Sequence, residues 1–102
     1  MKTIQITMVR VYITEGKHQL QKIMGCLHDE MRVRGVTVFR GIAGFGKSGR
    51  IHSSDLLDMS LDLPLVVEFF DEPDRLRPIL EYIHSLVGPG HIVCWTATLN
   101  DE

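Results

Sequence analysis

The sequence predicts an α+β fold in which two helices cover one face of a four-stranded antiparallel sheet. Three observations lead to this prediction. Two segments carry apolar residues spaced three and four apart, as on one face of a helix. Four others show the alternating or β-branched pattern of strands. These patterns follow one another in the order βαββαβ. With 102 residues, the chain is expected to form one domain, residues 1–102, around a single core.

The first half of the chain contains a strand, a helix and a second strand. Val9, Val11 and Ile13 alternate with more polar residues, which is the two-residue period of a strand. A helix is expected next, with Gly35 placed as the residue that follows its C-terminus. Residues 36–42 are then β-branched and aromatic and form the second strand. The apolar positions of the predicted helix are Leu20, Ile23, Met24, Leu27 and Met31.

The second half repeats the pattern of strand, helix and strand. Residues 65–70 form the third predicted strand and residues 92–99 the fourth. Between them, Pro73 suits an early helical position, and an apolar stripe ends before Gly88. Pro78 leaves two interpretations open: either the helix starts near Arg75 with Pro78 in its first turn, or it kinks there. The βαββαβ order is the split-βαβ, ferredoxin-like arrangement. The stripe consists of Leu76, Ile79, Leu80, Ile83 and Val87.

The sheet face opposite the helices is expected to be rich in apolar side chains. Apolar surface of that size favours an oligomer that covers it. A mixed face that solvent tolerates is the alternative, because much of the surface of soluble proteins is apolar. The residues expected there are Met8 and Tyr12, with Phe39 or Phe70 and Cys94 or Trp95 depending on register.

Composition narrows the classes of function. The net charge is -2, with Lys and Arg scattered among Asp and Glu, so a nucleic acid is not an expected partner. No run approaches the roughly 20 apolar residues of a membrane span, and the start lacks the apolar region of a signal peptide. We therefore expect a cytoplasmic protein. Cys26 and Cys94 lie far apart without C-x-x-C spacing, which favours two reduced thiols over a disulfide.

Residues 40–53 contain a formal phosphate-loop pattern. Gly41, Gly46, Lys47 and Ser48 match G-x-x-x-x-G-K-[ST], whose backbone N–H groups bind phosphates. The motif also requires a helix that starts at the Lys-Ser pair. Gly49 follows directly instead, and the residues after it lack helical apolar spacing. A small phosphate-loop NTPase is therefore the least favoured of three functional hypotheses, and it would require Mg²⁺-dependent hydrolysis.

The segment from Gly44 to Pro64 is too long for an ordinary hairpin loop, and loops of that size are usually functional or disordered. Its first half suits an anion, because glycines let backbone N–H groups approach a phosphate and nearby cations add charge. Its second half suits a short helix or a protein contact. A solvated flexible loop is the alternative. The first half holds Gly44, Gly46, Lys47, Gly49, Arg50 and His52, and the second holds Asp55, Leu56, Leu57, Asp58, Met59, Leu61 and Asp62.

The run 40–46, followed by residues 49–53 and later by 61–64, resembles the signature of the domain of unknown function 190 family. Residues 11–13 also resemble it, so the likeness covers nearly the whole chain. That family is similar in fold to the PII signalling proteins. These are ferredoxin-like homotrimers that bind adenine nucleotides between subunits and contact a transporter or enzyme through the loop after the second strand. The resemblance implies a homotrimeric regulatory protein that binds ATP, ADP or AMP.

The resemblance also directs attention to two glycine-containing segments as the ligand site. The turn from Gly88 to His91 takes the position of the second PII phosphate loop, but it is shorter and has His91 where a Lys is usual. No Tyr lies between Gly44 and Pro64, so the tyrosine uridylylation of some PII proteins has no acceptor in this loop. The predicted ligand-binding residues are Gly41, Gly44, Gly46, Lys47, Arg50, His52, Gly88, Gly90 and His91.

Neither a metal site nor a catalytic site is predicted. His18, His28 and His84 have no His or Cys at helical ligand spacing, and strand alternation places His91 and Cys94 on opposite faces. No Ser or Cys has a base nearby in the sequence, so we do not expect an enzyme. The hypothesis from another class is a nucleotide-independent structural or metal-handling partner of a membrane transporter. Its contact would be made by the segment from Asp55 to Leu61.

Overall fold

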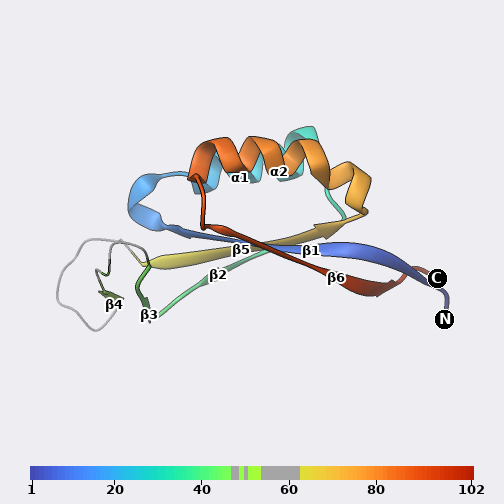
Figure 1. Ribbon diagram of the computed structural model, residues 1–102, viewed down its shortest axis with the longest axis horizontal. Helices are drawn as coiled ribbons and strands as arrows, with labels where there is room; N and C mark the ends of the chain where they lie inside the picture. Colours follow the sequence, from blue (N-terminus) through green and yellow to red (C-terminus); the bar gives the residue numbers. More distant parts are fainter. Residues whose placement is uncertain (47–48, 50, 54–62) are drawn as a thin grey trace.

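The computed structural model of the protein describes residues 1–46, 49, 51–53 and 63–102. Its main element is a four-stranded antiparallel sheet with the strand order β2-β5-β1-β6. Two helices, α1 and α2, lie on the same face of this sheet (Figure 1). The predicted ferredoxin-like α+β fold is confirmed. The elements of the sheet and its helices are β1 (Thr3–Thr14), α1 (Leu20–Met24), β2 (Gly35–Arg40), β5 (Pro64–Asp71), α2 (Pro73–Val87) and β6 (Ile92–Asn100).

The core lies between the helices and the sheet, and the sequence periods explain why. Val9, Val11 and Ile13 of β1 are buried because their shared parity turns them all toward the helices. The stripe predicted on α2 meets them from above, with Leu76, Ile79 and Ile83 buried. Each such side chain contributes about 1.5–3 kcal/mol when it is fully buried rather than exposed. The rest of the buried cluster consists of Ile23, Cys26, Leu27, Leu65, Val67 and Phe69.

The first helical region differs from its prediction. A 3₁₀ turn, η1 (Glu15–Lys17), precedes α1, and a π-helical segment, η2 (Gly25–Glu30), follows it. The prediction that Gly35 follows the helix C-terminus is wrong, because Gly35 is the first residue of β2. A Cβ atom on Gly35 would lie 2.5 Å from Cε1 of the Phe70 ring, so packing across the sheet explains this glycine.

The start of the second helix decides between the two interpretations of Pro78. Helix α2 begins at Pro73, which takes the first helical position, where its fixed φ and missing N–H are tolerated. The interpretation in which the helix starts near Arg75 is therefore wrong, and Pro78 lies in the helix interior. The helix ends at Gly88, whose φ of 77° is unfavourable for residues with a side chain. The Gly88 N–H donates a 2.9 Å hydrogen bond to the carbonyl of His84.

The sheet face away from the helices, called the open face below, is covered by no element of the described chain (Figure 1). Strand register decides which residues lie on it. Met8 pairs with Phe70 on one side and with Trp95 on the other. Cys94 pairs with the buried Val9 and therefore shares the helix-covered side. The apolar side chains of the open face include Met8, Tyr12, Phe39, Phe70, Val93 and Trp95.

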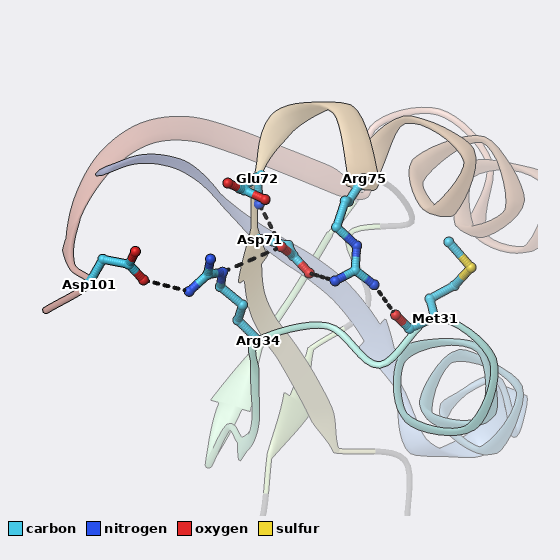
Figure 2. A network of polar contacts seen from close by, with 6 residues as sticks. All are labelled: Met31, Arg34, Asp71, Glu72, Arg75 and Asp101. Carbon is cyan, nitrogen blue, oxygen red and sulfur yellow. Dashed lines mark hydrogen bonds and ion pairs between the residues drawn. The ribbon is translucent and has the colours of Figure 1, made fainter. Parts of the chain in front are cut away.

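The end of the sheet that carries both chain termini, called the distal end below, holds a fully buried carboxylate, Asp71 (Figure 2). Its Oδ1 accepts a 2.7 Å hydrogen bond from the N–H of Glu72, at the start of α2. Nη1 of Arg75 lies 3.3 Å from Oδ2, and Nε of Arg34 lies 3.8 Å from Oδ1. Two cations and a backbone donor therefore compensate the buried charge, as burial of an ion requires.

The two arginines extend this contact to other segments (Figure 2). Arg75 also donates to the carbonyl of Met31, just after the π-helical segment. Arg34, which precedes β2, donates from Nη1 to Asp101 at 3.0 Å, just after β6. The network around Asp71 thus connects the ends of β5 and β6 with the start of β2 and the end of the first helical region.

Candidate functional site

Four strand ends lie at the end of the sheet opposite the termini, called the loop end below. Strands β1 and β2 finish there, and β5 and β6 begin there. A short hairpin, β3 (Ala43–Gly44) and β4 (His52–Ser53), extends from this end (Figure 1). Its base is fixed by the N–H of Gly41, which donates a 2.7 Å hydrogen bond to the carbonyl of Pro64. Those predicted site residues that the structure describes belong to this end of the molecule.

The first group of predicted glycines lies at the hairpin base, where two of its three members contact Pro64. A Cβ atom on Gly41 would lie 2.8 Å from Cγ of Pro64, and one on Gly44 would lie 3.4 Å from the same atom. A Cβ atom on Gly46 would meet nothing within 4 Å. Packing of the chain against Pro64 therefore requires a glycine at position 41, whereas position 46 has no such requirement.

Of the three basic residues in the predicted phosphate loop, the structure describes only the backbone of His52. Lys47 and Arg50 lie outside the described residues, and the backbone of His52 pairs with Gly44 in the β3-β4 hairpin. The chain that follows the glycines thus forms a strand at residues 52–53. A phosphate-loop NTPase needs a helix directly after the motif, so the hairpin argues against that hypothesis.

The second group of predicted residues forms the turn before β6. Gly88 and Gly90 have φ values of 77° and 88°, which only glycine adopts readily. His91 is held in place twice by Tyr12: its Nδ1 donates to the Tyr12 carbonyl at 2.9 Å, and its own carbonyl accepts from the Tyr12 N–H at 2.9 Å. This turn is therefore a well-defined structure rather than a loose connection.

The two glycine groups lie at the same end of the sheet but at opposite edges. The first group follows β2 and the second precedes β6, and these are the two edge strands. With β5 and β1 between them, three strand spacings separate the edges, or roughly 14 Å. One protomer therefore brings the groups to one end without bringing them into contact.

A cleft of about 380 Å³ opens at the loop end, beside the edge strand β2. It lies where η1, the first turn of α1 and the ends of β2 and β5 meet. Among the predicted ligand-binding residues that the structure describes, none lines this cleft. Its lining residues are Glu15, His18, Leu20, Gln21, Val38, Arg40 and Leu65.

An ion pair lies in this cleft. Nε of Arg40, the last residue of β2, contacts Oε1 of Glu15, the first residue after β1. The Arg40 side chain is 67% exposed, whereas the Glu15 side chain is only 13% exposed. Oε1 of Glu15 is buried and accepts no hydrogen bond from any residue in the described part of the chain. Glu15 is thus paired with one arginine, and only the exposed 13% of its side chain is accessible to a ligand.

Sequence reasoning missed this pair for an identifiable reason. Glu15 and Arg40 are 25 positions apart, and no spacing rule relates them. The information that could have predicted the contact lies in the order of the strands. In the βαββαβ order, the residue after the first strand and the last residue of the second strand belong to the same end of the sheet. A carboxylate and a guanidinium at those two positions are therefore candidates for a contact.

The open face also contains a charged pair among its apolar side chains. Nε of Arg10 donates to Oε1 of Glu68 at 2.8 Å, and the Arg10 guanidinium lies 5.6 Å from the centre of the Trp95 ring. The hydrogen bond to Glu68 raises the pKa of Arg10 above its ordinary value, so the residue remains charged. A cation over an aromatic face is attracted by the ring quadrupole.

The described residues offer little evidence for a metal site or a reactive thiol. No three His, Cys, Asp or Glu side chains of residues 1–46, 49, 51–53 and 63–102 gather as metal ligands. Cys26 and Cys94 are free, as the sequence predicted, and burial raises the pKa of both thiols. Raised pKa values keep thiols protonated and weakly nucleophilic. The helices in the described ranges are all too short or too polar to cross a membrane.

Known proteins resemble this chain in sequence and in fold. A UPF0166 protein of Aquifex aeolicus is 43% identical over 54 residues, a match that spans 53% of this chain and 51% of that protein. A UPF0166 protein of Methanocaldococcus jannaschii is 26% identical over 98 residues, covering 91% of this chain and 89% of the relative. The chain thus matches about half the length of the Aquifex relative and most of the Methanocaldococcus one.

The solved structure of CPII is similar in fold. CPII is a nitrogen regulatory PII-like protein from Thiomonas intermedia K12, and this structure holds ADP, AMP and bicarbonate. The TM-score is 0.72 at 15% identity, over 96% of this chain and 89% of CPII, so the likeness establishes a PII-like fold. The model of the DUF190 family (Uncharacterized ACR, COG1993) matches residues 6–99. The chain therefore belongs to the DUF190 family.

Proposed function

We propose that the protein is a PII-like regulatory protein of the cytoplasm that binds an adenine nucleotide between the subunits of a homotrimer. The loop 44–64 would carry the signal to a transporter or enzyme. The observation that supports this proposal most strongly is the fold shared with CPII, whose structure holds ADP and AMP. The site would bind and release its ligand without chemical conversion.

The open face supports the oligomeric part of the proposal. It presents aromatic and aliphatic side chains around the ion pair of Arg10 and Glu68. Aromatic residues and Arg are enriched at the centres of protein interfaces. A second copy that covers this face would bury the aromatic side chains and shield the ion pair from solvent.

The two glycine groups support a ligand site that involves more than one subunit. They lie at one end of the sheet, at edges roughly 14 Å apart. If each edge faces a neighbouring copy, the turn of one subunit can approach the hairpin base of another. The N–H group of Gly90 would then contact a phosphate oxygen, with Lys47 and Arg50 supplying positive charge.

The ligand part is tested by isothermal titration calorimetry with ATP, ADP and AMP. The variant Lys47→Ala/Arg50→Ala should bind the preferred nucleotide about tenfold or more weakly, because it loses charge-assisted contacts. Lys22→Ala/Arg77→Ala is the matched control, since it removes the same charges from exposed helical positions. Unchanged affinity in the loop variant would contradict the assignment of these cations.

The oligomeric part is tested by sedimentation equilibrium. Trp95→Asp should shift the protein toward monomers, because it places a charge in the interface. Tyr82→Asp is the control, since Tyr82 and Trp95 are each 41% exposed but Tyr82 lies on α2. A Trp95→Asp protein that keeps the mass of the wild type would contradict assembly through the open face.

A second candidate function is a nucleotide-independent partner of a membrane transporter. The observation that favours it is a set of exposed apolar side chains around the β3-β4 hairpin, namely Ile42, Phe45 and Ile51. Such side chains next to one another commonly mark protein contacts. The predicted contact segment from Asp55 to Leu61 lies outside the described residues.

The two candidates separate in a pull-down from membranes with and without ADP. Capture that is lost with Phe45→Ser and is indifferent to nucleotide would favour the second candidate. Capture that changes with nucleotide would favour the first. Tyr82→Ser serves as the control for removal of an exposed aromatic side chain from another surface.

A further inference from the structure

The cleft beside β2 is built differently from a phosphate site. We infer that it binds a small zwitterionic molecule of the α-amino acid class, with the ligand carboxylate on Arg40 and the ligand ammonium on Glu15. The cleft borders the first glycine group, because Arg40 directly precedes Gly41, but the glycines of the two groups do not line it. The inference does not depend on nucleotide binding.

The charges of the cleft select the class of ligand. Glu15 supplies a carboxylate and Arg40 a guanidinium, and the two are in contact. A simple anion attracted by Arg40 is repelled by Glu15 at nearly the same distance, and a simple cation meets the reverse. A ligand with one positive and one negative group is attracted at both ends. The multiple negative charges of a nucleotide phosphate chain would be opposed by Glu15.

The geometry of the pair leaves both groups able to bind a ligand. Arg40 uses Nε toward Glu15, and a guanidinium carries five N–H donors in a planar fork that matches a carboxylate. With its side chain 67% exposed, Arg40 is accessible from solvent. A carboxylate has about four acceptor positions, and Glu15, with a side chain that is 13% exposed, lines the cleft.

The apolar part of the lining predicts which amino acids fit. Leu20, Val38 and Leu65 supply aliphatic surface next to the charged pair, and Gln21 adds an amide. The volume of about 380 Å³ is at the small end of ligand pockets, which range over roughly 300–1,000 Å³. A single amino acid with an aliphatic side chain suits both the size and the surface. Leucine is therefore expected to bind more tightly than glycine.

The wild-type protein tests the inference with three matched probes in a titration followed by ¹H–¹⁵N NMR. L-Leucine carries both charges, 4-methylpentanoate lacks the ammonium group, and 3-methylbutylamine lacks the carboxylate. Leucine should give saturable shifts at Gln21 and Val38, and each half-ligand should bind about tenfold or more weakly. A half-ligand that matches leucine would overturn the zwitterion assignment. Absence of saturable shifts with both leucine and glycine would overturn the site.

Two variants locate the binding. Glu15→Gln and Arg40→Gln should each weaken leucine binding about tenfold, because each removes one charge-assisted contact and leaves a neutral polar side chain. Arg77→Gln is the control, since Arg77 is exposed on α2 and outside the cleft. Thermal unfolding verifies that each variant is folded, and the comparison of probes on the wild type stands without any variant.

A parallel titration with ADP keeps this inference distinguishable from the proposed function. Leucine binding without ADP binding would support the amino acid site in the cleft and contradict the proposed nucleotide binding. ADP binding without leucine binding would support nucleotide binding and contradict the amino acid site. If leucine affinity is the same in Glu15→Gln as in the wild type, the cleft assignment is wrong even when leucine binds.

Discussion

Each end of the sheet holds a carboxylate beside arginine, and the two carboxylates differ in what else surrounds them. Asp71 at the distal end is fully buried and has two guanidinium groups and a backbone N–H as partners. Glu15 at the loop end retains some exposure, has one arginine, and faces a cleft. The two sites share one pair of charge types and differ in burial and in the number of partners. Each also holds one buried carboxylate oxygen, Oδ2 of Asp71 and Oε1 of Glu15, that has no hydrogen-bond donor among the described residues.

The difference indicates which end is structural and which can take a ligand. Asp71 is fully buried and so is closed to a ligand, but removal of its charge leaves its arginines unpaired. The ion pair of Glu15 with one exposed arginine should contribute little to stability, and the exposed part of the Glu15 side chain can contact a donor from outside. The distal end should therefore control stability, and the loop end should control binding.

The largest expected effect is that of Asp71→Asn. The change keeps the shape of the side chain, removes the charge that Arg34 and Arg75 compensate, and weakens the acceptor for the N–H of Glu72. We expect a loss of about 3 kcal/mol in the free energy of unfolding. Urea unfolding at one fixed protein concentration measures it, since an oligomer unfolds in a concentration-dependent way.

Asp74→Asn is the matched control for that loss. Asp74 lies three positions away and pairs with Arg77 at 3.3 Å, but both side chains are exposed. Exposed ion pairs contribute little, so this change should cost no more than about 0.5 kcal/mol. Equal losses for the two variants would show that burial and the network around Asp71 do not govern the distal end.

The next effect tests how rigid the loop end is. Gly41→Ala places a Cβ 2.8 Å from Cγ of Pro64 and 3.3 Å from its carbonyl oxygen, so the hairpin base must shift. We expect a loss of about 2 kcal/mol, as for other overpacked sites. Gly46→Ala is the control, because a Cβ there meets nothing within 4 Å. Similar thermal stability of the two variants would mean that Pro64 moves freely.

These glycines also show where sequence-based prediction succeeds and where it stops. The strand containing Val9 and Val11 and the apolar stripe on α2 were predicted correctly, since alternation and helical spacing are local patterns. The role of Gly35 was predicted wrongly, because the ring that requires a glycine there belongs to Phe70. A contact between residues far apart in the chain leaves no local signal.

The candidate site follows the same division. The βαββαβ order alone predicts that the two glycine groups lie at the same end of the sheet. Strand register decides whether Trp95 or Cys94 lies on the open face. The structure places Trp95 there, and a shift of one residue would exchange the two. The pairing of Glu15 with Arg40 depends on the approach of two separate strand ends, which spacing alone does not give.

A smaller effect separates the two arginines of the distal end. Arg75 lies 3.3 Å from Asp71 and also donates to the carbonyl of Met31, whereas Arg34 lies 3.8 Å from Asp71. Methionine keeps much of the aliphatic stem, so Arg75→Met isolates the polar contacts. We expect it to cost about 1 kcal/mol and Arg34→Met to cost less. The reverse order in urea unfolding would assign the main compensation of Asp71 to Arg34.

The smallest expected change in stability is that of Glu15→Gln. Its Oε1 has no hydrogen-bond donor among the described residues, and its arginine is largely exposed. The amide keeps the shape, so the free energy of unfolding should change by no more than about 0.5 kcal/mol. The same variant should bind leucine about tenfold more weakly, because the ligand ammonium then meets no charge. A loss of stability as large as that of Asp71→Asn would show that both carboxylates are structural, and the cleft would then lack a group free to recognise a ligand.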